Sequence, residues 1–284
     1  MATDNVYLNG RIVPAQQACL SVADVGFLYG GSVFTTLIAT NGRAFRLGQH
    51  IRRLLDSAQM LDLRTTADPA ALAQSVSELL AANGLDKARL RITLSPGDVH
   101  SHQPTVLISA EPMPTYPPEW ITHGITVAVS PFKQGLGDPT YGFKTGCYFP
   151  RILARQEAHR KGAQEALWFT PDGRLAEGCF TNVFLVKDGA LATPPRDTPA
   201  VPGITRQAVM ELAEELKIAC DSEKDLLIHN LLEADEVFLS ATTTGITPVT
   251  RVERHAIGTE KPGTITQQLM AGYDALVEKE TAAG

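Results

Sequence analysis

Four prolines fall within the nine residues Glu111–Glu119, and this segment constrains the fold of the chain most strongly. Proline-rich stretches are stiff and extended, which is typical of a linker between domains. Its position predicts a small N-terminal domain at residues 1–113, a linker at 114–121 and a larger C-terminal domain at 122–284.

The first part of the chain has the patterns of a sheet with two helices. Asn-Gly, the strongest short signal for a hairpin turn, occurs at Asn9-Gly10 and again at Asn41-Gly42. Residues 27–40 are expected to form a loop that leads into a β-branched strand. Helical spacing and capping residues predict helices at 48–61 and 68–82. Apolar runs predict strands at 90–94 and 105–110.

The second part mixes short strands and helices in an irregular order, which favours an α+β fold over a regular series of βαβ units. The predicted strands lie at 125–129, 165–170, 181–186, 237–239 and 246–252. The predicted helices lie at 148–161, from 202 onward, and at 262–278.

Composition narrows the class of protein. With 44% hydrophobic residues, the 284-residue chain can bury a large core. Its net charge of −6 with both signs mixed gives no basic face for nucleic acid. The four scattered cysteines and seven histidines show neither a disulfide framework nor metal-site spacing. With no leader and no apolar run of membrane-spanning length, a cytoplasmic protein is expected.

One lysine stands out as a candidate nucleophile. Lys144 lies in a stretch of small and aromatic residues, with no other charge between Asp138 and Arg151. Small residues let the backbone approach a ligand closely, and apolar surroundings favour a neutral, nucleophilic amine. These are the requirements of a lysine that forms a Schiff base. The alternative is an ordinary surface lysine in a glycine-rich loop.

Four other features accompany this lysine, and each also has an ordinary structural explanation. Glu177 precedes a glycine and an apolar strand, where a carboxylate could hold a protonated pyridine nitrogen. Gly203-Ile204-Thr205 opens a helix after a proline, which suits a phosphate. Thr242-Thr243 could donate to the same phosphate, and Arg53 on the first helix has the planar fork that phosphate favours. The alternatives are a solvated strand-end glutamate, simple helix capping, a hydroxyl-rich turn and a surface arginine.

Together these pieces resemble the class IV aminotransferases, the fold type IV group of pyridoxal-phosphate enzymes. That group includes branched-chain and D-amino-acid aminotransferases, (R)-amine transaminases and aminodeoxychorismate lyases. The matching runs extend from Val6 to Val252 and include Val6–Gly10, Phe27–Gly30, His50–Leu54, Phe143–Thr145, Ala176–Cys179, Thr181–Phe184, Pro202–Arg206 and Gly245–Val249.

The resemblance implies a two-domain α+β fold, pyridoxal 5'-phosphate as cofactor and a homodimer that uses an amino donor and a 2-oxo acid. It assigns the Schiff base and the proton transfer to Lys144, the pyridine nitrogen to Glu177 and the phosphate to Arg53. The other implied cofactor contacts are Tyr148, Gly203, Ile204, Thr205, Thr242 and Thr243, and the implied substrate contacts are Tyr29, Phe34 and Arg91.

The substrate pocket departs from the family pattern. The family usually reads Tyr-Gly-Asp-Gly-Val-Phe-Glu, whereas this chain has Tyr-Gly-Gly-Ser-Val-Phe-Thr at 29–35. A transaminase is the preferred hypothesis. A lyase that releases pyruvate from aminodeoxychorismate on the same scaffold is the alternative, and a cofactor-binding relative without catalysis is a third.

Overall fold

The computed structural model describes residues 4–135 and 137–282, which form two compact units. Within the described residues, the first unit takes its members from Met1–Pro114, Phe143–Cys147 and Leu276–Gly284, and the second from Thr115–Gly142 and Tyr148–Ala275. The short stretch that carries Lys144 therefore groups with the N-terminal part of the chain. The domain boundaries given above stay a prediction.

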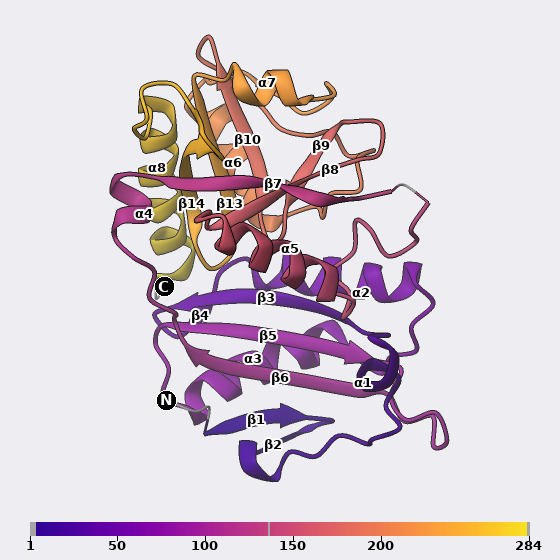
Figure 1. Ribbon diagram of the computed structural model, residues 1–284. Coiled ribbons are helices and arrows are strands. Elements are labelled where there is room, and N and C mark those ends of the chain that lie inside the picture. Colours follow the sequence, from indigo (N-terminus) through magenta and orange to yellow (C-terminus); the bar gives the residue numbers. More distant parts are fainter. Residues whose placement is uncertain (1–3, 136, 283–284) are drawn as a thin grey trace. The chain divides into compact units, whose positions relative to one another are not determined.

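The first unit contains an antiparallel sheet with strand order β2-β1-β6-β5-β3-β4 (Figure 1). The strands are β1 (Asn5–Leu8), β2 (Arg11–Pro14), β3 (Val33–Thr40), β4 (Arg43–Ala44), β5 (Ala88–Ser95) and β6 (Thr105–Pro112). The helical segments are η1 (Ala15–Gln17), α1 (Val25–Tyr29), α2 (Leu47–Met60) and α3 (Pro69–Ala82).

Helices α2 and α3 pack on each other and on this sheet around one apolar core. Leu54 of α2, Leu79 of α3 and Leu90 of β5 are almost completely buried there. Burying such a side chain contributes about 1.5–3 kcal/mol to stability. Both Asn-Gly hairpins and both predicted helices are confirmed, and Asp68 caps α3 by accepting a hydrogen bond from the Ala71 N–H at 2.9 Å.

The second unit is built on a mixed nine-stranded sheet, with order β12-β11-β10-β13-β14-β7-β8-β9 and β15 beside β14 (Figure 1). Its strands are β7 (Ile125–Lys133), β8 (Glu165–Phe169), β9 (Leu175–Gly178), β10 (Asn182–Lys187), β11 (Ala190–Ala192), β12 (Cys220–Asp221), β13 (Glu236–Ala241), β14 (Gly245–Val252) and β15 (His255–Ala256). The later helices are α4 (Glu119–Thr122), α5 (Phe149–Arg160), α6 (Ile204–Glu215), α7 (Ile228–Leu232) and α8 (Thr264–Thr281). The residues of α8 from Leu276 onward group with the first unit.

The two sheets with their helices confirm the α+β class, but some local predictions were wrong. Residues 25–29 form the short helix α1 where a loop was expected, because the buried Asp24 carboxylate accepts hydrogen bonds from the N–H groups of Gly26 and Phe27. Glu177 precedes the apolar strand β10 as expected, but it also lies within the short strand β9, which was not predicted. Of the helices in the described residues, none has the length and apolar character needed to cross a membrane.

Candidate functional site

The segment that carries Lys144 is attached to the first residues of β3. The Phe34 N–H donates to the Lys144 carbonyl at 2.8 Å, and the Gly146 N–H donates to the Ser32 carbonyl at 2.7 Å. Strand β4 pairs with the far end of β3, so this part of the strand edge accommodates the segment. A Cβ on Gly146 would lie 2.8 Å from the Gly30 carbonyl oxygen, so glycine permits the close approach.

The ring of Phe34 brings the lysine and a predicted substrate residue together. The Arg91 guanidinium carbon lies 3.5 Å from the ring centroid, and Lys144 Nζ lies 5.0 Å from it. Both are within the range of a cation–π interaction. Phe34 is buried, whereas Lys144 is half-buried and Arg91 is exposed. A buried aromatic surface therefore has two cationic side chains against it.

A buried polar group lies between β3 and α2. The hydroxyl of Thr35 accepts a hydrogen bond from Arg53 Nη2 at 3.0 Å and lies 2.8 Å from His50 Nδ1. Burial, together with the positive charges of Arg53, Lys144 and Arg46, holds the pKa of His50 well below its usual value. The imidazole is therefore neutral near pH 7, so one of its ring nitrogens is a donor and the other an acceptor.

Lys144 and Arg53, which the family resemblance assigns to the cofactor, thus both act electrostatically on one buried histidine. No role for His50 or Thr35 was predicted from the sequence. The available signal was the i, i+3 spacing of His50 and Arg53, which places both on one face of α2.

Replacing Thr35 with valine should lower the free energy of unfolding by about 1–3 kcal/mol, because Arg53 and His50 would both lose a buried polar partner. Thr36→Val is the matched control on the same strand, at a residue that is only half-buried, and it should change stability by less than about 0.5 kcal/mol. Denaturant unfolding of both variants measures the difference. Equal losses would contradict a specific role for the Thr35 hydroxyl.

Tyr29 is separate from this group. It ends α1 and is 74% exposed, and its neighbour Phe27 is 71% exposed. The first unit alone therefore does not surround this predicted substrate residue.

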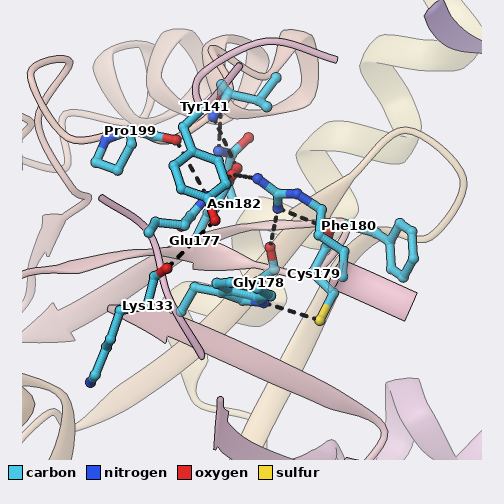
Figure 2. A network of polar contacts seen from close by, with 12 residues as sticks. Lys133, Tyr141, Glu177, Gly178, Cys179, Phe180, Asn182 and Pro199 are labelled. Atoms are coloured by element: carbon cyan, nitrogen blue, oxygen red, sulfur yellow. Dashed lines mark hydrogen bonds and ion pairs between the residues drawn. The ribbon is translucent and has the colours of Figure 1, made fainter. Parts of the chain in front are cut away.

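In the second unit, Glu177 is a buried carboxylate with three donors (Figure 2). Its Oε1 accepts from Arg151 Nη2 at 2.6 Å and from Gln134 Nε2 at 3.0 Å, and its Oε2 accepts from the Val201 N–H at 3.0 Å. Burial opposes the charge of Arg151, but the Glu177 carboxylate raises the pKa of that guanidinium above its usual value. Arg151 is therefore charged and forms a buried ion pair with Glu177, whose carboxylate oxygens can also accept from a cationic N–H.

The start of α6 adjoins the same segment. Gly203 is the N-cap of this helix, and a Cβ there would overlap Asn182 Oδ1. Asn182 Nδ2 in turn donates to the Val201 carbonyl at 2.9 Å. Val201 therefore connects Glu177 to the helix start, where the first N–H groups and the positive dipole end suit an anion. Ile204 and Thr205 form the first turn.

Thr242 and Thr243 follow β13 and are half-buried. Ser240 pairs with Asn182 across β10 and β13, so the two threonines lie at the end of the sheet where α6 starts. The Tyr116 hydroxyl donates to Thr243 Oγ1 at 3.1 Å, a contact that the sequence analysis missed.

Tyr148 immediately precedes α5 and lies beside the Arg151–Glu177 pair. Its ring centroid is 5.3 Å from the Arg151 guanidinium carbon and 5.6 Å from the centroid of the Phe180 ring. Tyr148 therefore lies close to the predicted partner of the pyridine nitrogen.

Three buried polar atoms of this region have no hydrogen-bond partner within the part of the chain that the structure describes. They are Gln134 Oε1, Thr181 Oγ1 and Ser240 Oγ. Gln134 contacts Glu177, while Thr181 and Ser240 adjoin Asn182 in sequence and in the sheet. Unsatisfied buried polar atoms are rare in native proteins, so their grouping fits a site that a polar ligand completes.

Known proteins match the chain over almost its whole length. The family model for amino-transferase class IV matches residues 32–252. The branched-chain-amino-acid aminotransferase of Escherichia coli is 32% identical, over 98% of this chain and 94% of that protein.

Solved structures agree with this match. A crystal structure of the Escherichia coli branched-chain enzyme has a TM-score of 0.93 at 31% identity and covers 99% of this chain and 97% of its own. The branched-chain amino acid aminotransferase from Thermobaculum terrenum, in its PLP-bound holo-form, has a TM-score of 0.88 at 26% identity, over 98% of this chain and 95% of its own. This chain therefore belongs to the class IV aminotransferase family.

Proposed function

We propose that this chain, a transaminase by its family, works with pyridoxal 5'-phosphate bound covalently to Lys144. The observation that carries the proposal is the attachment of the Lys144 segment to β3, with the amine 5.0 Å from the Phe34 ring centroid and its charge acting on the same histidine as that of Arg53. A nucleophilic amine and a phosphate-binding guanidinium are thereby held in one unit.

The second unit supplies groups of the right chemistry for the rest of the cofactor. Glu177, kept anionic by Arg151, would hold the pyridine N–H. The phosphate would take the N–H groups of Gly203, Ile204 and Thr205 with the hydroxyls of Thr242 and Thr243. Tyr148 would contact the ring hydroxyl. When bound, the cofactor supplies an electron sink that makes the α-hydrogen of an amino donor acidic.

Lys144 Nζ would move the proton. Displaced by an amino donor, this amine would take the α-proton of the donor and would later give it back, and a second substrate would reverse the path. The Phe34 ring, 5% exposed, would keep water from one side of this amine. A dry environment strengthens the electrostatic interactions on which proton transfer depends.

Substrate recognition would use the groups around Phe34. Arg91 is an exposed cation stacked on that ring, and its Nε donates to Thr93 Oγ1 at 3.1 Å. A fixed guanidinium of this kind suits a substrate carboxylate. Tyr29 would complete the pocket, and we propose 2-oxo acids and amino acids as the acceptors and donors.

A homodimer is proposed from the surface around α1. Large apolar side chains are exposed there: Leu20, Val22, Phe27, Leu28 and Tyr29. Five exposed apolar side chains within the ten residues 20–29 suit a protein–protein interface. Pairing of two copies over this surface would bury Tyr29, which the first unit leaves exposed.

The half-reaction tests the function. Cofactor-loaded protein given one amino acid and no oxo acid should lose its yellow colour and release one equivalent of 2-oxo acid per site. The matches to named aminotransferases do not favour the lyase alternative, which would instead release pyruvate from aminodeoxychorismate over many turnovers. A screen of L-amino acids, D-amino acids and (R)-amines identifies the donor. A coloured protein that reacts with none of them would contradict the proposal.

A further inference from the structure

Arg151 has three hydrogen bonds to consecutive residues at the end of β9. Its Nη2 donates to Glu177 Oε1 at 2.6 Å, and its Nη1 donates to the carbonyls of Gly178 at 3.2 Å and Cys179 at 3.1 Å. Only 6% of Arg151 is exposed. The guanidinium therefore fixes both the position of the Glu177 carboxylate and the backbone that follows it.

The donors on Glu177 leave a defined amount of acceptor capacity. A carboxylate has roughly four acceptor positions, about two on each oxygen. Arg151 and Gln134 fill both positions on Oε1, while Val201 fills one on Oε2. The Gln134 amide is itself oriented by a second acceptor, the Pro199 carbonyl at 3.4 Å. Room for one more donor therefore remains on Oε2.

We infer that Arg151 is a positioning residue that fixes Glu177 as an anion and turns Oε2 toward one further donor. The inference rests on the proposed function, in which that donor is the pyridine N–H. Arg151 reaches Glu177 from α5, so the strength of the hold on the cofactor ring depends on a residue that need not touch it.

The surroundings make Arg151 the ionised partner of this carboxylate. Tyr141, Tyr148 and Cys179 are titratable groups that interact electrostatically with Arg151. Burial, followed by the nearby Glu165, raises the pKa of the Cys179 thiol, which stays neutral. Removing the guanidinium would therefore leave a buried carboxylate without a counter-charge.

Arg151→Met in the cofactor-free protein tests the pairing. Its melting temperature should fall by about 10 °C at pH 8, because a buried charge loses its partner. Without Arg151, the buried Glu177 carboxyl would have a higher pKa in the folded variant than in the unfolded chain. The protonated carboxyl therefore stabilises the folded variant in acid, and this contribution is lost as the pH rises. The difference from wild type should therefore be larger at pH 8 than at pH 5. Arg160→Met, on an exposed residue of the same helix, is the control and should change little at either pH.

A second variant separates charge from packing. Arg151→Met combined with Glu177→Gln should lose the pH dependence and melt above the single variant at pH 8. If Arg151→Met does not fold, folding of the double variant alone supports the inference. The inference would be overturned if Arg151→Met lowered the melting temperature equally at both pH values and adding Glu177→Gln did not restore it. Failure of both variants to fold would overturn it as well.

The cofactor arm distinguishes this inference from the proposed function. Arg151→Lys should weaken binding of pyridoxal 5'-phosphate by about 10-fold or more, measured by titration of absorbance, because an ammonium lacks the planar fork that reaches Glu177 and the carbonyls of Gly178 and Cys179 together. Unchanged affinity, with the lysine adduct still formed, would overturn the inference and leave the proposed function standing. If Arg151→Met shows the expected pH dependence but the wild type forms no adduct on Lys144, the inference stands and the proposed function is overturned.

Discussion

Lys144→Ala should lower the turnover number for transamination by at least about 10²–10⁴-fold, the range that a positioned general acid–base group contributes. The variant removes both the attachment point of the cofactor and the amine that moves the proton. It should still fold, because the contact that fixes this segment uses the Lys144 carbonyl, which alanine retains. Steady-state kinetics with the donor found in the screen gives the loss.

Lys161→Ala is the matched control, since Lys161 is an exposed lysine whose amine lies 3.5 Å from a Glu253 carboxylate oxygen. It should keep wild-type turnover. Borohydride treatment followed by peptide mass analysis should place the cofactor on Lys144 in the wild type and in the control, and on no lysine of Lys144→Ala. A Lys144→Ala protein with full turnover would remove this lysine from the mechanism.

Local chemistry explains which parts of the fold could be predicted from the sequence. An Asn-Gly turn needs only its own two residues, and the cap of α3 lies within three residues of Asp68, so both were found. Helix α1 was missed because it has only five residues, too few for a helical period to show. The Asp24 carboxylate that begins it is held by Ser95 and Thr105, which are distant in sequence.

The candidate site divides in the same way. The roles assigned to Lys144, Glu177 and Arg53 came from motifs that each lie within a few residues. Arg151 and Gln134 lie 26 and 43 residues from Glu177, and no local pattern predicts that they meet on one carboxylate. A glutamate in the fully buried strand β9 contradicts the usual burial of residue types, and the ion pair to α5 explains the exception.

Gly203→Ala should destabilise the protein by about 1–3 kcal/mol, the usual penalty for forcing an extra methyl group into a packed site. Gly203 has φ −68°, so an alanine fits the backbone and the effect is steric. The new Cβ would overlap Asn182 Oδ1, and the Asn182 amide is held by the Val201 carbonyl. Because the clash moves the first N–H groups of α6, phosphate affinity should fall with stability.

Gly48→Ala is the matched control, since a Cβ there meets no atom within 4 Å and the residue lies in α2. It should stabilise the protein by about 0.4–1 kcal/mol by restricting the unfolded chain. Asn182→Ala removes the side-chain oxygen that the new Cβ would overlap, so a double-mutant cycle with Gly203→Ala tests whether the effect is steric. In the Asn182→Ala protein, Gly203→Ala should lower the free energy of unfolding by less than it does in the wild type. The double variant should also bind inorganic phosphate more tightly than Gly203→Ala alone. An equal penalty with and without Asn182 would show that α6 requires glycine at its start for another reason.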